Sequence, residues 1–249
     1  RVLKCNNSTG PDGIPNILLK KLCSQLCVPL CHIFTISFGS QQLPDDWKHA
    51  FVTPLFKQGV ASDPNNYRPI SLTSSCCRVM ERIINKELID YLLKNSLITK
   101  QQHGFIKSRS ACGNLLECLQ DWTVNFENKR VTDVIYVDFK KAFDRVSHSK
   151  LLTKLSSYGL SGDLFGWINS FLSNRTQAVR IDGFISKILN ILSGVPQGSV
   201  LGPTLFLLYI NDIIDCFGDL SVFSKLYADD FKLYVVMQQL ILVVICQKL

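Results

Sequence analysis

The chain has 249 residues, of which 47% are hydrophobic and 19% are charged. These values exclude a disordered chain and are typical of one large folded domain or two small ones. The formal net charge of +7 favours an anionic partner such as nucleic acid, although many proteins are mildly basic without binding it.

The first half of the chain alternates between helical and extended patterns. Apolar residues at helical spacing over 16–39 predict one or two helices, broken near Pro29. Residues 47–57 and 67–72 predict strands. A long amphipathic helix is expected over 75–95, because its apolar residues recur on one side.

The second half continues this alternation. A basic loop over 101–110 leads into a predicted helix, and the β-branched run TDVIYVDF predicts a strand that ends at Asp138. Ser147 and Gly159 suit the N-terminal cap and the C-terminal stop of one helix. The other predicted elements are a helix at 167–174, hairpins at 177–191 (around Asp182-Gly183) and 224–236, and a buried helix after the Gly/Pro-rich turn of 192–217. Interleaved helices and strands with antiparallel hairpins indicate an α+β fold.

Ten cysteines raise the question of disulfide bonds or zinc, but their spacing forms no metal-ligand pattern. Cys23, Cys27 and Cys31 recur every fourth residue beside His32, which places three small side chains on one helical face. Because buried cysteine behaves as a small hydrophobic residue, we predict that this face packs in the core. Free thiols favour a reducing, intracellular compartment.

The ends of the chain suggest a piece of a longer protein. Arg1 stands where an initiator methionine would be, and no signal peptide follows it. The apolar run LILVVIC near the end is too short to span a bilayer, so no membrane partner is expected. The sequence does not indicate an oligomeric state.

Three aspartates form the strongest candidate site. Asp138 ends one predicted strand, and Asp229 and Asp230 are expected to form the turn of a hairpin. If the strands are neighbours, the carboxylates converge, which is unfavourable unless a cation lies between them. Hard divalent cations such as Mg²⁺ prefer oxygen ligands, and two such ions support in-line displacement at phosphorus. The alternative is an ordinary solvated turn, because the spacing permits convergence without showing it.

Five blocks, in order, resemble the reverse transcriptase domain of a non-LTR (LINE-type, jockey-like) retrotransposon. The resemblance extends from about Ser8 to Tyr234. The blocks are NYRPISL, QHGF with RS, DFKKAFDRV, SGVPQGSVLGPTLFLLYINDI and YADD. A single YADD would be weak support, whereas five ordered blocks are specific.

This resemblance implies a right-hand polymerase. Fingers and N-terminal helices would occupy 1–130, a palm with an antiparallel sheet bearing the catalytic aspartates 131–236, and a divergent tail 237–249. The thumb would be missing, so weak activity or none is expected from this chain. The implied activity is RNA-directed DNA polymerase, with RNA template, DNA primer, dNTPs and two Mg²⁺ ions (or Mn²⁺), and the implied compartment is the nucleus.

The resemblance also implies roles for individual residues. Asp138, Asp229 and Asp230 would be the catalytic metal ligands, with the backbone carbonyl of Phe139 adding an oxygen. The residues implied to contact the incoming nucleotide are Phe143, Gln197, Gly198, Arg68 and Lys57. Among these, the Phe143 ring would exclude a 2′-hydroxyl, and Arg68 suits the triphosphate because its planar fork binds phosphate oxygens in pairs.

Simpler interpretations stay open for most of these positions. Phe143 alone is typical of a core residue, Asp144 of a helix start, and Lys107 and Arg109 of a solvated loop. Phe231 departs from the small polar residue usual in the family. Two alternative functions also remain: a catalytically inactive nucleic-acid-binding remnant, and an unrelated metal-dependent phosphodiesterase, which would leave VPQG and NYRPISL unexplained.

Overall fold

The structure is a computed structural model and describes residues 9–217 and 222–238. The chain divides into two compact units, each built from two segments. Unit 1 comprises Arg1–Leu92 and Phe143–Leu205, and unit 2 comprises Leu93–Ala142 and Phe206–Leu249. The predicted tail at 237–249 falls mostly on 239–249, which lie outside the described residues.

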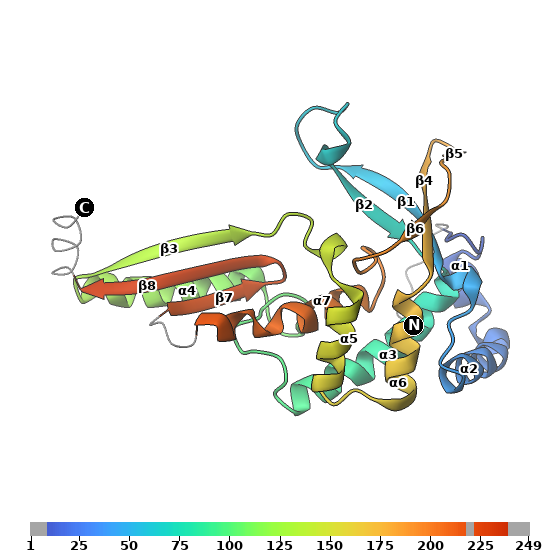
Figure 1. The fold of residues 1–249 in the computed structure, drawn as a ribbon, viewed down its shortest axis with the longest axis horizontal. Helices are drawn as coiled ribbons and strands as arrows, with labels where there is room; N and C mark the ends of the chain where they lie inside the picture. The colour runs from blue at the N-terminus through green and yellow to red at the C-terminus, as the bar shows by residue number, and fades with distance from the viewer. Residues whose placement is uncertain (1–8, 218–221, 239–249) are drawn as a thin grey trace. The chain divides into compact units, whose positions relative to one another are not determined.

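Unit 1 contains a mixed sheet of five strands (Figure 1). The order is β2-β1-β4-β5, with β6 also pairing with β4; β1 and β4 run parallel and the other pairs antiparallel. The strands are β1 (His49–Phe56), β2 (Tyr67–Leu72), β4 (Arg175–Ile181), β5 (Phe184–Ile185) and β6 (Leu189–Ile191). Asp182 and Gly183 link β4 to β5 with φ of 48° and 87°, which confirms the predicted hairpin turn.

Helices form the rest of unit 1, and their residues pack in its core with buried residues of β1 and β4. The helices are α1 (Asn16–Lys21), α2 (Cys23–Gly39), α3 (Ser75–Lys94), α5 (His148–Ser157), α6 (Gly162–Leu172) and the start of α7 (Gly202–Ile210), with short 3₁₀ turns η1 (Asp45–Trp47), η2 (Pro64–Asn66) and η3 (Phe143–Arg145). Ser147 caps α5 by accepting from the Lys150 N–H, and Gly159 follows its end with φ of 80°, as the sequence predicts. Leu88, Leu151 and Trp167 are among the fully buried core residues.

Two predictions about the N-terminal helices are wrong. The break lies at Leu22, and α2 continues through Pro29. Proline removes one helical hydrogen bond, but contacts beyond it, including a 3.1 Å bond from the Trp167 indole N–H to Ser37 Oγ, hold the second half of α2. Cys23, Cys27 and Cys31 are exposed, because within the described residues α2 meets α6 through its other face.

Unit 2 is a three-stranded antiparallel sheet with one long helix against it (Figure 1). The order is β3-β8-β7, formed by β3 (Arg130–Asp138), β7 (Val222–Tyr227) and β8 (Asp230–Gln238). Helix α4 (Ala111–Glu127) packs on one face, where the Tyr234 hydroxyl hydrogen-bonds Asp121.

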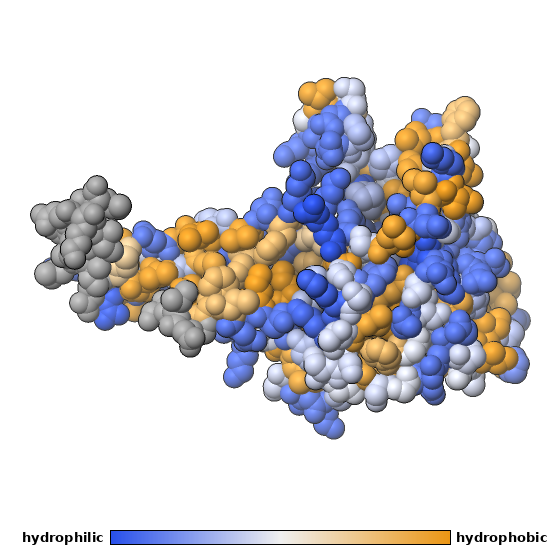
Figure 2. Space-filling view, in the orientation of Figure 1, coloured by the Kyte–Doolittle hydropathy of each residue, from blue (hydrophilic) through white to orange (hydrophobic). Residues whose placement is uncertain are grey.

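The other face of this sheet carries the apolar cluster of unit 2. Leu226, Phe231 and Leu233 are buried there against the end of α7 and the 3₁₀ turn η4 (Asn211–Phe217). Figure 2 shows apolar residues gathered over these strands, and Ile135, which pairs with Leu233, is more than half exposed. In the part of the chain that the structure describes, every helix is too short or too polar to cross a membrane.

Candidate functional site

Asp138 and Asp230 meet at the same end of the unit 2 sheet. Strands β3 and β8 are direct neighbours, and their register pairs Asp138 with Asp230, which in turn pairs with Tyr227 on β7. Because paired residues of antiparallel strands point to the same face, the two carboxylates lie side by side. The strands that carry these aspartates are therefore neighbours, which is the condition that convergence of the carboxylates requires.

The hairpin turn lies one residue earlier than the sequence predicts. Asp230 is the first residue of β8, so Ala228 and Asp229 alone separate the strands. Asp229 is partly buried, whereas Asp138 and Asp230 are exposed. Within residues 9–217 and 222–238, no group of three or more His, Cys, Asp or Glu side chains lies close enough to hold a metal ion.

A cavity of about 320 Å³ opens beside the carboxylate pair. It is lined by Ala111, Asn114, Leu115, Tyr136, Val137, Asp138, Tyr227, Asp230, Phe231 and Lys232. The Lys232 ammonium donates to Asn114 Oδ1 at 2.7 Å. Two carboxylates at paired positions supply the oxygen donors that suit a hard divalent cation, so the residues present fit such an ion.

Phe139 and Phe231 flank these aspartates in sequence and belong to the apolar cluster of unit 2. Phe231 is 2% exposed, and Phe139 packs against the buried Leu226, Phe231 and Leu233. Phe231 points away from the carboxylates because it alternates with Asp230 along β8. Its size is therefore explained by packing.

Gln197 and Gly198 lie in unit 1, in a turn held against β2. The Ser71 N–H donates to the Gln197 carbonyl at 2.7 Å. Gly198 has φ of 113°, and a Cβ there would lie 2.5 Å from the Ser71 carbonyl oxygen. A side chain at this position would therefore both strain the backbone and collide with β2.

Asp144 has a role that the sequence left open. Its Oδ1 accepts a 2.9 Å hydrogen bond from Gln197 Nε2, which ties the segment after β3 to the turn before α7. Backbone bonds join the same segments, from Val195 N–H to the Phe143 carbonyl at 2.9 Å and from Gly194 N–H to the Val146 carbonyl at 2.8 Å. Asp144 thus orients the Gln197 amide.

The other predicted nucleotide contacts also belong to unit 1. Arg68 is exposed on β2, opposite Leu55 on β1, and Lys57 is exposed directly after β1. Phe143 begins η3 and is partly buried. The predicted residues therefore fall into two groups, the aspartates in unit 2 and the five nucleotide contacts in unit 1.

Glu81 ties α3 to the start of α7, a role that the sequence did not predict. It is fully buried in α3, and its Oε2 accepts from the Val200 N–H at 2.7 Å and the Leu201 N–H at 3.0 Å, directly before α7. Burial raises the pKa of Glu81, and these two backbone donors oppose that rise. A charged residue on the apolar stripe of Cys77 and Ile84 was the signal that could have found it.

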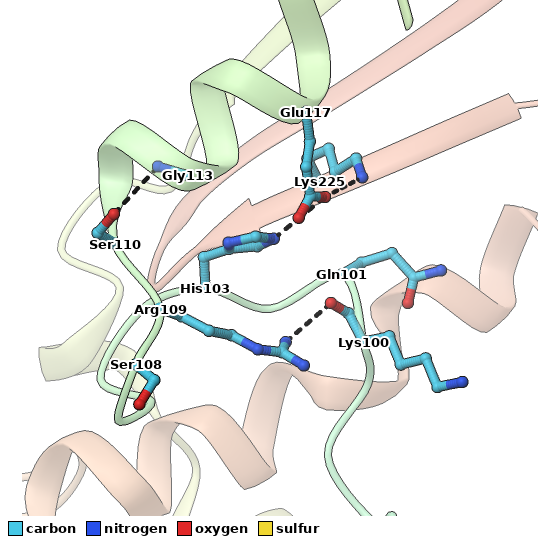
Figure 3. A pocket seen from close by; sticks show the side chains of 9 residues that line it. All are labelled: Lys100, Gln101, His103, Ser108, Arg109, Ser110, Gly113, Glu117 and Lys225. Carbon is cyan, nitrogen blue, oxygen red and sulfur yellow. Dashed lines mark hydrogen bonds and ion pairs between the residues drawn. The ribbon is translucent and has the colours of Figure 1, made fainter. Parts of the chain in front are cut away.

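A second cavity, of about 510 Å³, lies at the start of α4 (Figure 3). Glu117 accepts a hydrogen bond from Lys225 and lies 3.4 Å from His103 Nε2. The Lys225 bond lowers the pKa of Glu117, while burial lowers that of His103 against the attraction of Glu117. Arg109, expected in a solvated loop, instead donates to the Lys100 carbonyl at 2.8 Å and closes that loop.

Comparisons with known proteins agree with this geometry. A sequence profile described as reverse transcriptase (RNA-dependent DNA polymerase) matches residues 56–248. A probable RNA-directed DNA polymerase from transposon X-element of Drosophila melanogaster is 32% identical over 230 residues, covering 90% of this chain and 25% of that protein. The RNA-directed DNA polymerase from mobile element jockey of the same species is 32% identical over 234 residues, covering 92% of this chain and 25% of that protein.

A solved structure shares the fold. Telomerase from Candida tropicalis, in complex with a TWJ fragment of telomeric RNA, superposes with a TM-score of 0.56 at 11% identity, covering 94% of this chain and 42% of that one. The chain spans about a quarter of the length of the curated relatives that it matches.

Proposed function

The chain belongs to the reverse transcriptase (RNA-dependent DNA polymerase) family, and from that premise we propose that it is the polymerase domain of a non-LTR retrotransposon. It would add dNTPs to the 3′-hydroxyl of a DNA primer on an RNA template. The likeness to the jockey and X-element enzymes supports the element type. The RNA-bound telomerase of the same fold supports an RNA template.

The observation that carries the proposal is the pairing of Asp138 with Asp230 across β3 and β8. Asp138, Asp229, Asp230 and the Phe139 carbonyl would hold two Mg²⁺ ions, or Mn²⁺ in their place. When bound, such ions lower the pKa of an attacking hydroxyl and neutralise charge on the leaving pyrophosphate. The protein supplies fixed carboxylates at one sheet end, and these orient the ions and the primer end.

The residues of unit 1 would bind the nucleotide. Arg68 and Lys57, both exposed, would neutralise the triphosphate, and Gln197, held by Asp144, would contact the nucleotide with Gly198. Phe143 would exclude the 2′-hydroxyl of a ribonucleotide. We further propose that the fingers comprise 1–130 and the palm 131–236, and that the enzyme acts on chromosomal DNA in the nucleus.

Extension of a DNA primer annealed to an RNA template tests the proposal. The chain is compared with its Asp229→Ala variant, in Mg²⁺ and in EDTA, with circular dichroism as a check on folding. Weak extension that requires Mg²⁺ and disappears in Asp229→Ala is the expected result. No extension by the folded chain would favour a nucleic-acid-binding remnant, and phosphodiester hydrolysis without a primer would favour a metal-dependent phosphodiesterase.

A further inference from the structure

The turn that carries Asp229 contains an unusual backbone conformation. Ala228 has φ of 56°, in the left-handed region that residues with a Cβ seldom occupy, and it is 5% exposed. Such a conformation persists only where the surroundings hold it. Asp229 and Asp230 follow Ala228 directly, so the contacts that hold Ala228 also fix the backbone from which these two side chains extend.

Gln102 makes the contacts that hold it. Its side-chain oxygen accepts from the Ala228 N–H at 2.9 Å and from the Gly104 N–H at 2.8 Å. Its amide nitrogen lies 3.5 Å from the Ala228 carbonyl and donates toward it. Gln102 is 2% exposed, so these bonds are made away from water, where an unsatisfied partner is costly.

The backbone around Gln102 is itself fixed to β7. The Leu226 N–H donates to the Gln101 carbonyl at 3.0 Å, and the His103 N–H donates to the Leu226 carbonyl at 2.8 Å. Residues 101–103 thus add a short parallel bridge to the edge of β7. A Cβ on Gly104 would lie 2.3 Å from the Ala228 nitrogen, so only glycine allows this approach.

We propose that Gln102 is a positioning residue for the metal-binding carboxylates. It acts through Ala228: by satisfying both polar groups of that residue, it fixes the turn that carries Asp229 and leads into Asp230, the residue paired with Asp138. The contact between Gln102 and Ala228 is independent of the proposed function. Its consequence for metal binding rests on that function. Gln102 takes no part in proton transfer or in making or breaking covalent bonds.

Three variants of the full chain test the proposal. Gln102→Met keeps the length of the side chain and removes its strong acceptor and donor, whereas Gln102→Glu keeps an oxygen for the two N–H groups. Gln101→Met is the matched control, because Gln101 has the same side chain and its carbonyl makes the neighbouring bridge, but its side chain does not reach Ala228. Thermal unfolding of each variant checks that it is folded.

The first measurement is hydrogen–deuterium exchange of the peptide spanning 226–231. Gln102→Met is expected to exchange about tenfold faster there, the change that corresponds to one lost buried hydrogen bond, with protection of β3 retained. Gln102→Glu and Gln101→Met are expected to match the parent chain. Equal exchange in Gln102→Met and Gln101→Met would overturn the proposed contact, whatever the function of the chain.

The second measurement is the affinity of the protein for Mn²⁺ in the absence of nucleic acid. The electron paramagnetic resonance signal of the free ion reports how much Mn²⁺ is unbound. Gln102→Met is expected to bind about tenfold more weakly and Gln102→Glu to recover to within about threefold of the parent. Faster exchange with unchanged Mn²⁺ affinity would overturn the positioning role. Equal Mn²⁺ affinities of the parent and Asp229→Ala would instead overturn the proposed function, and the positioning role with it. If Gln102→Met does not fold, a tenfold weaker affinity in the folded Gln102→Glu overturns the proposal.

Discussion

Asp138 and Asp230 are paired residues at the end of two adjacent antiparallel strands, with their carboxylates on one face of the sheet. Like charges at directly opposed positions destabilise a sheet. The arrangement therefore weakens the free protein and becomes favourable when a cation binds between the carboxylates. Stability measured with and without metal reports on this balance.

Replacing one carboxylate should separate these two effects. Asp138→Asn is expected to raise the free energy of unfolding in EDTA by about 0.5 kcal/mol, because it removes the repulsion. It should also abolish the rise in Tm that Mg²⁺ gives the parent chain. Thermal unfolding in EDTA and in Mg²⁺ measures both. Asp133→Asn, an exposed aspartate on the same strand opposite Val235, is the control and should retain the Mg²⁺ response.

Glu81 should make stability depend on pH. Its pKa in the folded chain is raised above 4.5, so its contribution is present at lower pH and is lost as pH rises through the raised value. The free energy of unfolding of the parent minus that of Glu81→Gln is therefore expected to fall as pH rises above 4.5. Cys77 and the buried Arg175 are the other ionisable groups that act on it.

Urea unfolding between acidic and neutral pH measures this difference. Glu87→Gln is the control, because Glu87 lies on the same helix with its side chain 72% exposed. A difference that stays constant or increases with pH would contradict the assignment.

Gly198 and Gly183 separate backbone strain from collision. Both have positive φ, but only Gly198 faces a backbone atom at a distance that a Cβ cannot tolerate. Gly183→Ala is expected to cost about 1 kcal/mol from conformation alone. Gly198→Ala should cost about 2 kcal/mol more, because it must also displace Ser71. Urea unfolding of the two variants gives the comparison. Equal decreases in the free energy of unfolding would show that the close approach of Gly198 to Ser71 adds no cost.

Asp144 should affect nucleotide binding through Gln197. Asp144→Ala removes the acceptor for the Gln197 amide and is expected to raise KM for dNTP about fivefold, with primer affinity unchanged. Steady-state extension kinetics measure both constants. Asp163→Ala is a close control, because Asp163 accepts a 2.9 Å bond from Gln41 elsewhere in unit 1. A fall in kcat alone would argue against a role in orienting Gln197.

Phe143 should determine the choice of sugar. Phe143→Ala is expected to reduce the preference for dNTPs over rNTPs by about tenfold or more, because the ring no longer fills the space of the 2′-hydroxyl. Competition between the two nucleotides in primer extension measures the ratio. Phe184→Ala, at an exposed hairpin position, should leave it unchanged. An unaltered ratio in Phe143→Ala would assign the ring to packing.

Local features were predictable because neighbouring residues encode them. The cap at Ser147, the turn at Asp182-Gly183 and the strand ending at Asp138 each depend on a few adjacent side chains. The three aspartates were identified as a candidate site, but the pairing of Asp138 with Asp230 was not, because sequence spacing does not show which strands are neighbours. Periodicity and turn chemistry therefore led to the candidate site.

The parts that escaped prediction involve polar contacts between distant segments. Nothing near Gln102 in the sequence indicates that its oxygen accepts from Ala228, and Glu81 has its partners beyond β4. The exposed cysteine face of α2 shows a related difficulty: periodicity identifies a face, but packing partners decide whether it is buried. Such choices are made by tertiary structure and leave no periodic pattern.

The sheet order β3-β8-β7 also has a consequence during translation. Among the described strands, β3 pairs with β8 alone, and the ribosome synthesises β8 roughly ninety residues later, a delay of about 5 to 20 s at ordinary elongation rates. During that interval β3 is an unpaired strand with apolar side chains, and a stalled nascent chain would offer it to chaperones or to other chains. The two carboxylates come together only once synthesis reaches β8, so the chemistry of this unit is assembled last.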